Sequence, residues 1–193
     1  MKVKIRRSNQ GDLDNVFNLH AKCFTQADQW YKSAIRSYLD KGIVVELKDT
    51  NQLIAVLLQG SITPCNHKFM DSDDNDKYQA DVFDPVNDTG KMLQTNNLHF
   101  KELFGIVMIC VDPQYRGKGL AKKIIEKHFQ DNPNKVVCLN TRKSNIGAFM
   151  LYKSMGYEHV AYIRNKYFLP TEDSVFMIKD LTEEIKSNES NIN

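Results

Sequence analysis

The chain has 193 residues, of which 41% are hydrophobic and 26% charged, and its formal net charge is +2. This length and composition predict one globular domain over residues 1–181 and a polar, flexible tail over 182–193. The balanced charge excludes the strongly basic footprint of a nucleic-acid-binding protein. No apolar stretch approaches the roughly 20 residues of a membrane span, and the N-terminus lacks the apolar region of a signal peptide. We therefore expect a cytoplasmic protein without nucleic-acid or membrane partners.

The N-terminal segments predict one strand and two helices. Residues 2–6 alternate between polar and apolar side chains, which is typical of a strand. Apolar residues at helical spacing predict a helix over 13–24, with Asp12 as its N-cap. A second helix is expected from Trp30, and Gly42 is expected to end it.

A hairpin and a long insert follow. Residues 42–47 and 53–62 predict two strands joined by a turn over 49–52. Residues 63–101 form a long polar insert that is rich in aspartate. Long loops in compact domains are usually functional or disordered. The acidic insert could steer a cationic amine toward a site, although a charge run is more often only solvated.

An apolar strand then leads into an amphipathic helix. Residues 103–111 are almost all apolar, with β-branched members, which is typical of a strand covered on both faces. Helical periodicity starts at about Gly119. The N–H groups and positive dipole end of such a helix attract an anion. Gly117 and Gly119 would let the backbone approach a phosphate closely.

The sequence of this loop excludes two common phosphate-binding motifs. No segment reads G-x-x-x-x-G-K-[ST], and G-x-G-x-x-G fails because Lys122 stands where the third glycine belongs. Arg116, Gly119 and Ala121 instead resemble the pyrophosphate-binding motif [Q/R]-x-x-G-x-[G/A] of the GNAT superfamily of N-acetyltransferases.

A second motif lies downstream at the distance usual in that family. Its pattern, N-x-x-A-x-x-x-Y-x-x-x-G-[F/Y], is matched by Asn145, Ala148, Tyr152, Gly156 and Tyr157. Around it we expect a strand over 135–141, a helix over 145–155, and two strands over 157–167 and 174–179. The resemblance implies an α/β (α+β) GNAT acyl-CoA N-acyltransferase fold. This is a central mixed sheet with splayed fourth and fifth strands, flanked by about four helices.

The resemblance also implies acetyl-CoA as co-substrate, with no metal. Its pyrophosphate would lie over the amides of residues 117–122, and its pantetheine would run along the strand to Val111, where an N–H would polarise the thioester carbonyl. Arg116 and Lys118 would add charge near the phosphates, or would be solvated loop cations. The expected cofactor-binding residues are Ile109, Cys110, Val111, Arg116, Gly117, Lys118, Gly119, Leu120, Ala121, Lys122 and Asn145.

Catalytic roles follow from the resemblance in the same way. Tyr152 falls where the family keeps its general acid, and a phenol with a pKa of about 10 holds its proton at neutral pH. Its alternative role is packing, and the alternative role of Asn145 is helix capping. The family's usual position for a base holds Asn140, which cannot serve. Glu102 and His99 could act through a water, and His159 is a weaker candidate.

The C-terminal hairpin suggests the acceptor. It resembles the tyrosine-bearing hairpin of RimI-like and Naa-type N-terminal acetyltransferases, and Tyr167 would contact a peptide N-terminus there, unless it is simply exposed. We therefore expect direct attack of a primary amine on the thioester. A small amine or polyamine is the alternative acceptor, and a non-catalytic acyl-CoA-binding module is the alternative class. Acidic side chains in the cleft would favour a polyamine, whereas an open groove beside Tyr167 would favour a peptide.

The cysteines give a further expectation. Cys23, Cys65, Cys110 and Cys138 lack the spacing of metal ligands, and three of them fall in apolar periodic segments. Reduced core residues are therefore expected rather than ligands or disulfides.

Overall fold

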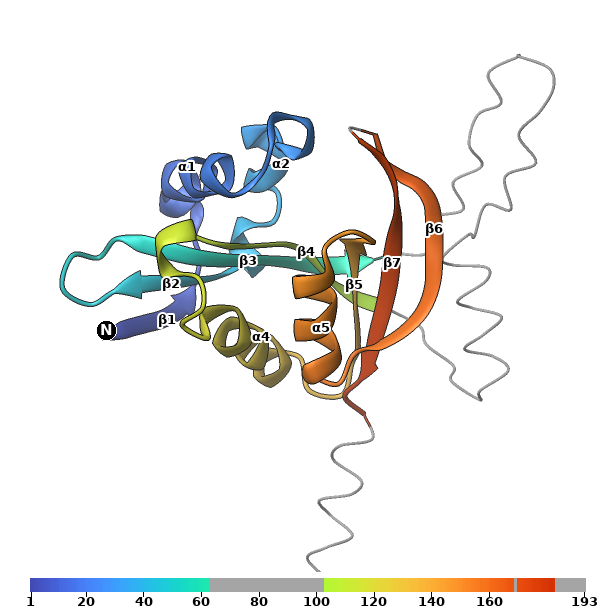
Figure 1. The fold of residues 1–193 in the computed structure, drawn as a ribbon. Coiled ribbons are helices and arrows are strands. Elements are labelled where there is room, and N and C mark those ends of the chain that lie inside the picture. Colours follow the sequence, from blue (N-terminus) through green and yellow to red (C-terminus); the bar gives the residue numbers. More distant parts are fainter. Residues whose placement is uncertain (63–102, 169, 183–193) are drawn as a thin grey trace, which may run out of the picture.

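The centre of the fold is a seven-stranded mixed sheet (Figure 1). A computed structural model describes residues 1–62, 103–168 and 170–182; the predicted insert and nearly all of the predicted tail therefore lie outside the described residues. The strands are β1 (Val3–Arg7), β2 (Ile43–Leu47), β3 (Leu53–Ile62), β4 (Leu103–Val111), β5 (Val136–Arg142), β6 (Glu158–Phe168) and β7 (Thr171–Asp180). Their order is β1-β2-β3-β4-β5-β7-β6, and β4 and β5 are the parallel pair. This confirms the predicted mixed sheet with a central parallel pair.

Helices cover both faces of the sheet, as Figure 1 shows. They are α1 (Leu13–Cys23), α2 (Lys32–Arg36), α4 (Leu120–Asp131) and α5 (Ile146–Ser154). One core cluster joins α1 and α2 to Val44 of β2, and the other joins α4 and α5 to Ile43 and Val45. Alternate residues of one strand thus serve opposite faces. Within the described ranges, no helix has the length and apolarity needed to cross a membrane.

One expectation for the N-terminal helices is wrong, and a second is confirmed only in part. The helix expected from Trp30 to Gly42 is only the five-residue α2, followed by a 3-10 turn. Ser37 Oγ donates to the carbonyl of Ala34 at 2.7 Å, a side-chain bond of the kind that competes with continued helix. Asp12 is the N-cap residue of α1, as expected, but its side chain makes no capping bond. Its carboxylate instead accepts from the backbone N–H of Asn9 and pairs with Arg6.

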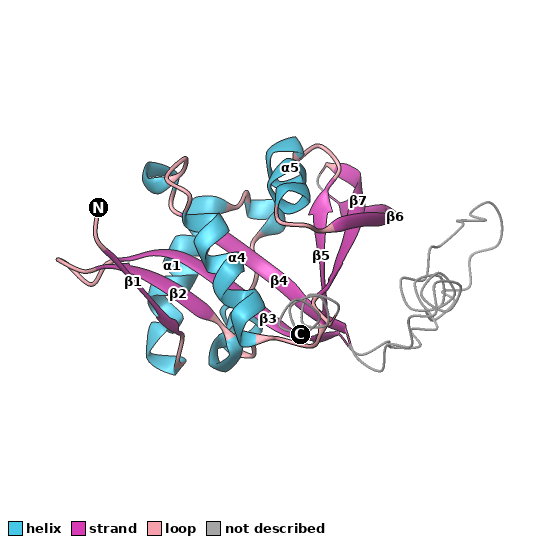
Figure 2. Cartoon of the chain, turned by 90° about the horizontal axis from the view of Figure 1, so that it is seen from below, coloured by secondary structure: helices cyan, strands magenta, loops and turns pink. Residues whose placement is uncertain are grey.

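The β4 and β5 strands pair at one end and separate at the other. Their pairing runs from Leu103 opposite Val136 to Ile106 opposite Leu139. Beyond that point β4 stays paired with β3 up to Val111, and β5 stays paired with β7 up to Arg142. The two strands therefore diverge, and Figure 2 shows the angle between them. We call the space between β4 residues 107–111 and β5 residues 140–142 the wedge.

A β-bulge lies where the strands begin to separate. Met108 lies opposite Leu58, but Ile106 lies opposite Gln59, so Val107 is an extra residue in β4. Val107 and Met108 consequently both pack on the α1 face. Burial of β4 is complete over its first four residues and then alternates. The expectation that both faces of the whole strand are covered is therefore wrong for its C-terminal half.

Candidate functional site: the wedge and the glycine loop

Backbone polar groups of β4 point into the wedge. Asp112 N–H donates to the carbonyl of Ile54 at 2.9 Å, which makes these two residues a hydrogen-bonded pair of the antiparallel ladder. Because such pairs alternate along a ladder, the N–H and C=O groups of Val111 and Ile109 point away from β3. They face the side on which β5 has already separated. The C-terminal half of β4 thus presents donors and acceptors to the wedge.

The loop after β4 delivers a helix N-terminus to the same strand end. Asp112 is buried, and its carboxylate accepts from Gln114 N–H at 3.1 Å and pairs with Lys22 at 3.4 Å. This bond starts the 3-10 turn that leads into the loop. Gly117 and Gly119 then adopt left-handed φ values of 72° and 73°.

Gly119 is the N-cap of α4 and supplies no capping side chain. The ladder of α4 begins with Lys123 N–H donating to Gly119 O at 3.1 Å. The amides of Leu120, Ala121 and Lys122 therefore have no partner within the helix. A Cβ atom placed on Gly117 or Gly119 would meet nothing within 4 Å, so open space lies in front of both. Amides at a helix N-terminus with open space beside them are suited to an anion.

The basic side chains of the loop lie near the strand end and over an aromatic ring. Arg116 Nε donates to the carbonyl of Val111 at 3.2 Å. Lys118 Nζ lies 4.9 Å from the centroid of the Tyr115 ring. Both cations are exposed and lie in the same loop as these amides. An anion bound there would therefore experience their charge in addition to the backbone amides.

Two thiols meet at the same strand end. The Cys23 thiol donates to the carbonyl of Val111 at 3.3 Å, so this oxygen is shared with Arg116. A hydrogen bond from Cys110 and the nearby Arg116 guanidinium lower the pKa of Cys23 to about 7, against the opposing effect of burial. The same bond to Cys23, together with burial, raises the pKa of Cys110. Cys23, Cys110 and Cys138 are free thiols; Cys110 and Cys138 lie in the core, as expected, whereas Cys23 is half-buried.

Tyr152 lies in the core between α5 and the sheet. Its side chain is 5% exposed, and its ring packs edge to face against Tyr157 with the centroids 5.8 Å apart. Burial raises the pKa of the Tyr152 phenol, and the neighbouring Tyr167 and Cys110 add to this. Tyr152 therefore packs in the core, and its role as a general acid stays a prediction. A raised pKa also means that the phenol keeps its proton at neutral pH.

Three further expected positions have defined surroundings. Asn145 Oδ1 accepts from Ala148 N–H at 3.1 Å, which confirms its role as the α5 N-cap. Asn140 Oδ1 accepts from Ser174 Oγ at 3.2 Å. His159 packs edge to face on the rings of Phe149 and Tyr162. Glu102 and His99 lie outside the described residues.

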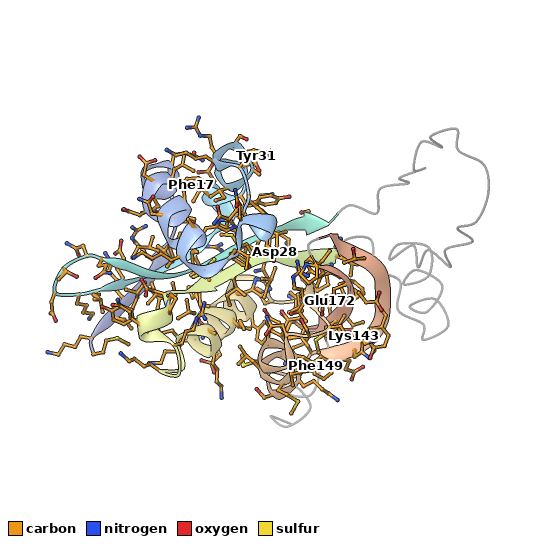
Figure 3. The ribbon with its side chains drawn as sticks, turned by 45° about the horizontal axis from the view of Figure 1, so that its top comes forward. Phe17, Asp28, Tyr31, Lys143, Phe149 and Glu172 are labelled. Atoms are coloured by element: carbon orange, nitrogen blue, oxygen red, sulfur yellow. The ribbon has the colours of Figure 1, made fainter. Side chains whose placement is uncertain are left out.

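A pocket of about 670 Å³ lies beyond the C-terminal end of β5. Figure 3 shows two of its acidic residues, Asp28 on the α1–α2 connection and Glu172 on β7. Between them, Arg142 Nη2 donates to Asp28 at 2.6 Å and Arg142 Nη1 donates to Glu172 at 3.2 Å. Its guanidinium carbon also lies 4.2 Å from the centroid of the Tyr167 ring. The lining residues are Thr25, Gln26, Asp28, Arg142, Ser144, Pro170 and Glu172.

Sequence reasoning identified Tyr167 but missed Arg142 and its two carboxylates. The three residues come from separate segments, and no local spacing connects them. A weak signal was present in the polar end of β5, where Asn140, Thr141 and Arg142 follow four apolar residues.

Sequence comparisons with known proteins give matches to the segment that contains the glycine loop and extends to the start of β6. Residues 85–159 match the family model "Acetyltransferase (GNAT) domain". The N-alpha-acetyltransferase RimI of Mycobacterium tuberculosis (strain ATCC 25618 / H37Rv) is 32% identical over 72 residues. That alignment covers 37% of this chain and 46% of the relative, so the similarity spans less than half the length of the curated protein.

Solved structures match nearly the whole chain. The ribosomal-protein-S18-alanine N-acetyltransferase from Escherichia coli has a TM-score of 0.67 and 16% identity, covering 94% of this chain and 95% of that chain. Arabidopsis thaliana NAA60 in complex with acetyl-CoA has a TM-score of 0.68 and 17% identity, and the match covers 93% of this chain and 99% of that chain. At these identities the likeness concerns the fold.

Proposed function

We infer that this chain belongs to the GNAT superfamily, whose domain model matches residues 85–159, and that it is an acetyl-CoA-dependent N-acetyltransferase acting on the N-terminal amine of a peptide or protein. One observation carries the proposal. The part of β4 that no longer pairs with β5 and the glycine loop that starts α4 meet at Val111, where β4 and β5 have diverged. A ligand with an extended polar arm and a pyrophosphate would use both features together.

The residues of the loop and strand fit such a ligand. We assign pyrophosphate binding to the amides of residues 117–122, with Arg116 and Lys118 adding charge. We assign the pantetheine arm to the polar edge of Ile109 and Val111, because those groups face the wedge. Acetyl-CoA, when bound, supplies an acetyl group activated as a thioester. The known acetyl-CoA complex of NAA60, whose fold is similar, supports this assignment.

The chemistry assigned to the chain is polarisation of a carbonyl and donation of a proton. The N–H of Val111 points into the wedge and is our candidate for polarising the carbonyl under attack. Tyr152 Oη holds a proton at neutral pH and is our candidate for donating it to a departing thiolate. The amine must lose a proton before attack. Asn140 cannot accept one, so Glu102 acting through a water remains our proposal for the base.

We assign the acceptor to the pocket beyond β5. It lies beside Tyr167, and its volume is within the usual range of small-ligand sites, about 300–1,000 Å³. Similarity to RimI supports a peptide N-terminus as the acceptor. The presence of Asp28 and Glu172 favours a polyamine as the second candidate. Arg142 already pairs with both carboxylates, which weakens that alternative.

The test has two stages. Calorimetric titration with acetyl-CoA measures cofactor binding, and thiol release is then followed with separate pools of free-N-terminus peptides, polyamines and small arylalkylamines. We expect micromolar binding and release with the peptide pool. Release with polyamines alone would replace the peptide proposal with its alternative. Binding without release from any pool would favour a non-catalytic acyl-CoA module, and absence of binding would contradict the proposal as a whole.

A further inference from the structure

Cys23 and Cys110 bring two separate elements together at the wedge. Cys23 is the last residue of α1, and its Sγ lies 3.3 Å from the carbonyl oxygen of Val111. Cys110 immediately precedes Val111 in β4, and its side chain packs in the same α1-side cluster as Cys23. The two thiols lie close enough for each to shift the pKa of the other. The end of a helix and a strand thus meet at a pair of thiols.

The two thiols differ in exposure and surroundings. Cys23 is half-buried and lies beside Arg116, whose Nε donates to the same carbonyl. Cys110 is 2% exposed. A partly exposed cysteine beside a cation provides a reactive thiolate, whereas a buried thiol in contact with it is protected from direct attack. This asymmetry is that of an attacking cysteine and a resolving cysteine.

We propose that Cys23 and Cys110 are an oxidation site, at which a hydroperoxide converts the dithiol into a disulfide that links α1 to β4. This inference is independent of the acetyltransferase proposal.

The proposed reaction balances with hydrogen peroxide as the oxidant. The Cys23 thiolate attacks one peroxide oxygen, the O–O bond breaks, and hydroxide leaves and takes up a proton to become water. Cys23 is then a sulfenic acid. The sulfur of Cys110 attacks the Cys23 sulfur, releases its proton, and displaces the hydroxyl group as a second water. Two thiol hydrogens and two electrons have passed to the peroxide.

Cys138 provides an internal comparison. It is fully buried in β5, and burial raises the pKa of its thiol to about 12. It therefore supplies almost no thiolate at neutral pH and should resist the same treatment. The proposed oxidation should therefore affect Cys23 and Cys110 and leave Cys138, the third described cysteine, reduced.

The test uses the full chain, fully reduced and then treated with equimolar hydrogen peroxide. Remaining thiols are alkylated after denaturation, and the products are analysed by intact mass and peptide mapping. We expect a loss of two hydrogens, a cross-linked peptide pair containing Cys23 and Cys110, and full alkylation of Cys138. The variant Cys138→Ser should give the same cross-link. In Cys110→Ser, Cys23 should accumulate as a sulfenic acid that dimedone traps.

Alkylation of Cys110 in most molecules after Cys23 has been oxidised would overturn the proposal. So would a peptide map in which Cys23 is joined to Cys65 or to a second molecule. If the Cys110→Ser chain does not fold, the peptide map of the wild-type protein still shows whether Cys23 is joined to Cys110 or to another cysteine.

Discussion

The guanidinium of Arg142 stacks on the ring of Tyr167, with the guanidinium carbon 4.2 Å from the ring centroid. The same guanidinium bridges Asp28 of the α1–α2 connection and Glu172 of β7. One side chain therefore joins the end of β5 to both walls of the pocket that we assign to the acceptor.

Arg142→Gln should impair use of the acceptor. Loss of the planar guanidinium leaves Asp28 and Glu172 without their shared partner and Tyr167 without its stacked cation. We expect the acceptor KM to rise about tenfold, equivalent to about 1.4 kcal/mol, with acetyl-CoA affinity unchanged. Steady-state kinetics and titration measure the two quantities separately.

Lys143→Gln is the matched control for this variant, because Lys143 is exposed and its nearest carboxylate contact, with Asp173, is 3.9 Å long. The acceptor KM of the Lys143→Gln variant should remain at the wild-type value. A lower melting temperature in Arg142→Gln with an unchanged acceptor KM would show that the cluster has only a structural role.

Gly119→Ala should weaken both folding and cofactor binding. The φ of 73° at Gly119 costs an L-residue about 1–2 kcal/mol, although the added methyl group has open space around it. We expect destabilisation of that size in urea unfolding. We also expect a several-fold loss of acetyl-CoA affinity, because the methyl group would stand where the backbone approaches the phosphate.

Gly147→Ala is the control for Gly119→Ala. Gly147 also has open space, but it lies in the first turn of α5 without a positive φ. Alanine there should be neutral or slightly stabilising. Equal effects of the two substitutions would contradict the account of the loop.

His128 should make the fold less stable in acid. It is fully buried against Gln59 and Asn132, and burial lowers its pKa from 6.5 to about 4. Because the pKa is lower in the folded chain, the unfolded chain takes up a proton first as the pH falls below about 6.5. Stability is therefore lost between about pH 6.5 and pH 4. The contribution by pH 4.5 is on the order of 2 kcal/mol.

Urea unfolding at pH 7.5, 5.5 and 4.5 measures this effect. A His128→Gln variant should lose less stability than the wild type over the same interval, since glutamine does not titrate. Parallel pH profiles for the two proteins would show that other groups cause the acid sensitivity.

Local sequence signals predicted the elements that depend on local chemistry. The bounds of β4 follow from an apolar run that ends at Asp112 and Pro113, and the start of α4 follows from Gly119. The shortness of α2 was not predictable from periodicity, because the bond from Ser37 to Ala34 competes with the helical pattern. Asp12 satisfies the capping pattern, yet Arg6 from a neighbouring strand engages its carboxylate instead.

Non-local features of the site were not predictable. The bulge at Val107 exists only relative to β3, and the wedge depends on where two strands stop pairing. The cluster around Arg142 joins residues distant in the sequence. The roles of Tyr152, Arg116 and the other expected site residues remain predictions, since they concern a ligand.

The most direct measurement compares Tyr152→Phe with Tyr157→Phe. Both tyrosines are buried in the same cluster, and the Tyr157 hydroxyl has no hydrogen-bond partner among the described residues. The experiment measures acetyl-CoA affinity and the rate of thiol release with the preferred acceptor. We expect Tyr152→Phe to retain its affinity and lose about 10²-fold or more in kcat, as removal of a general acid does, while Tyr157→Phe stays near wild type. Equal turnover in Tyr152→Phe and wild type would contradict proton donation by Tyr152.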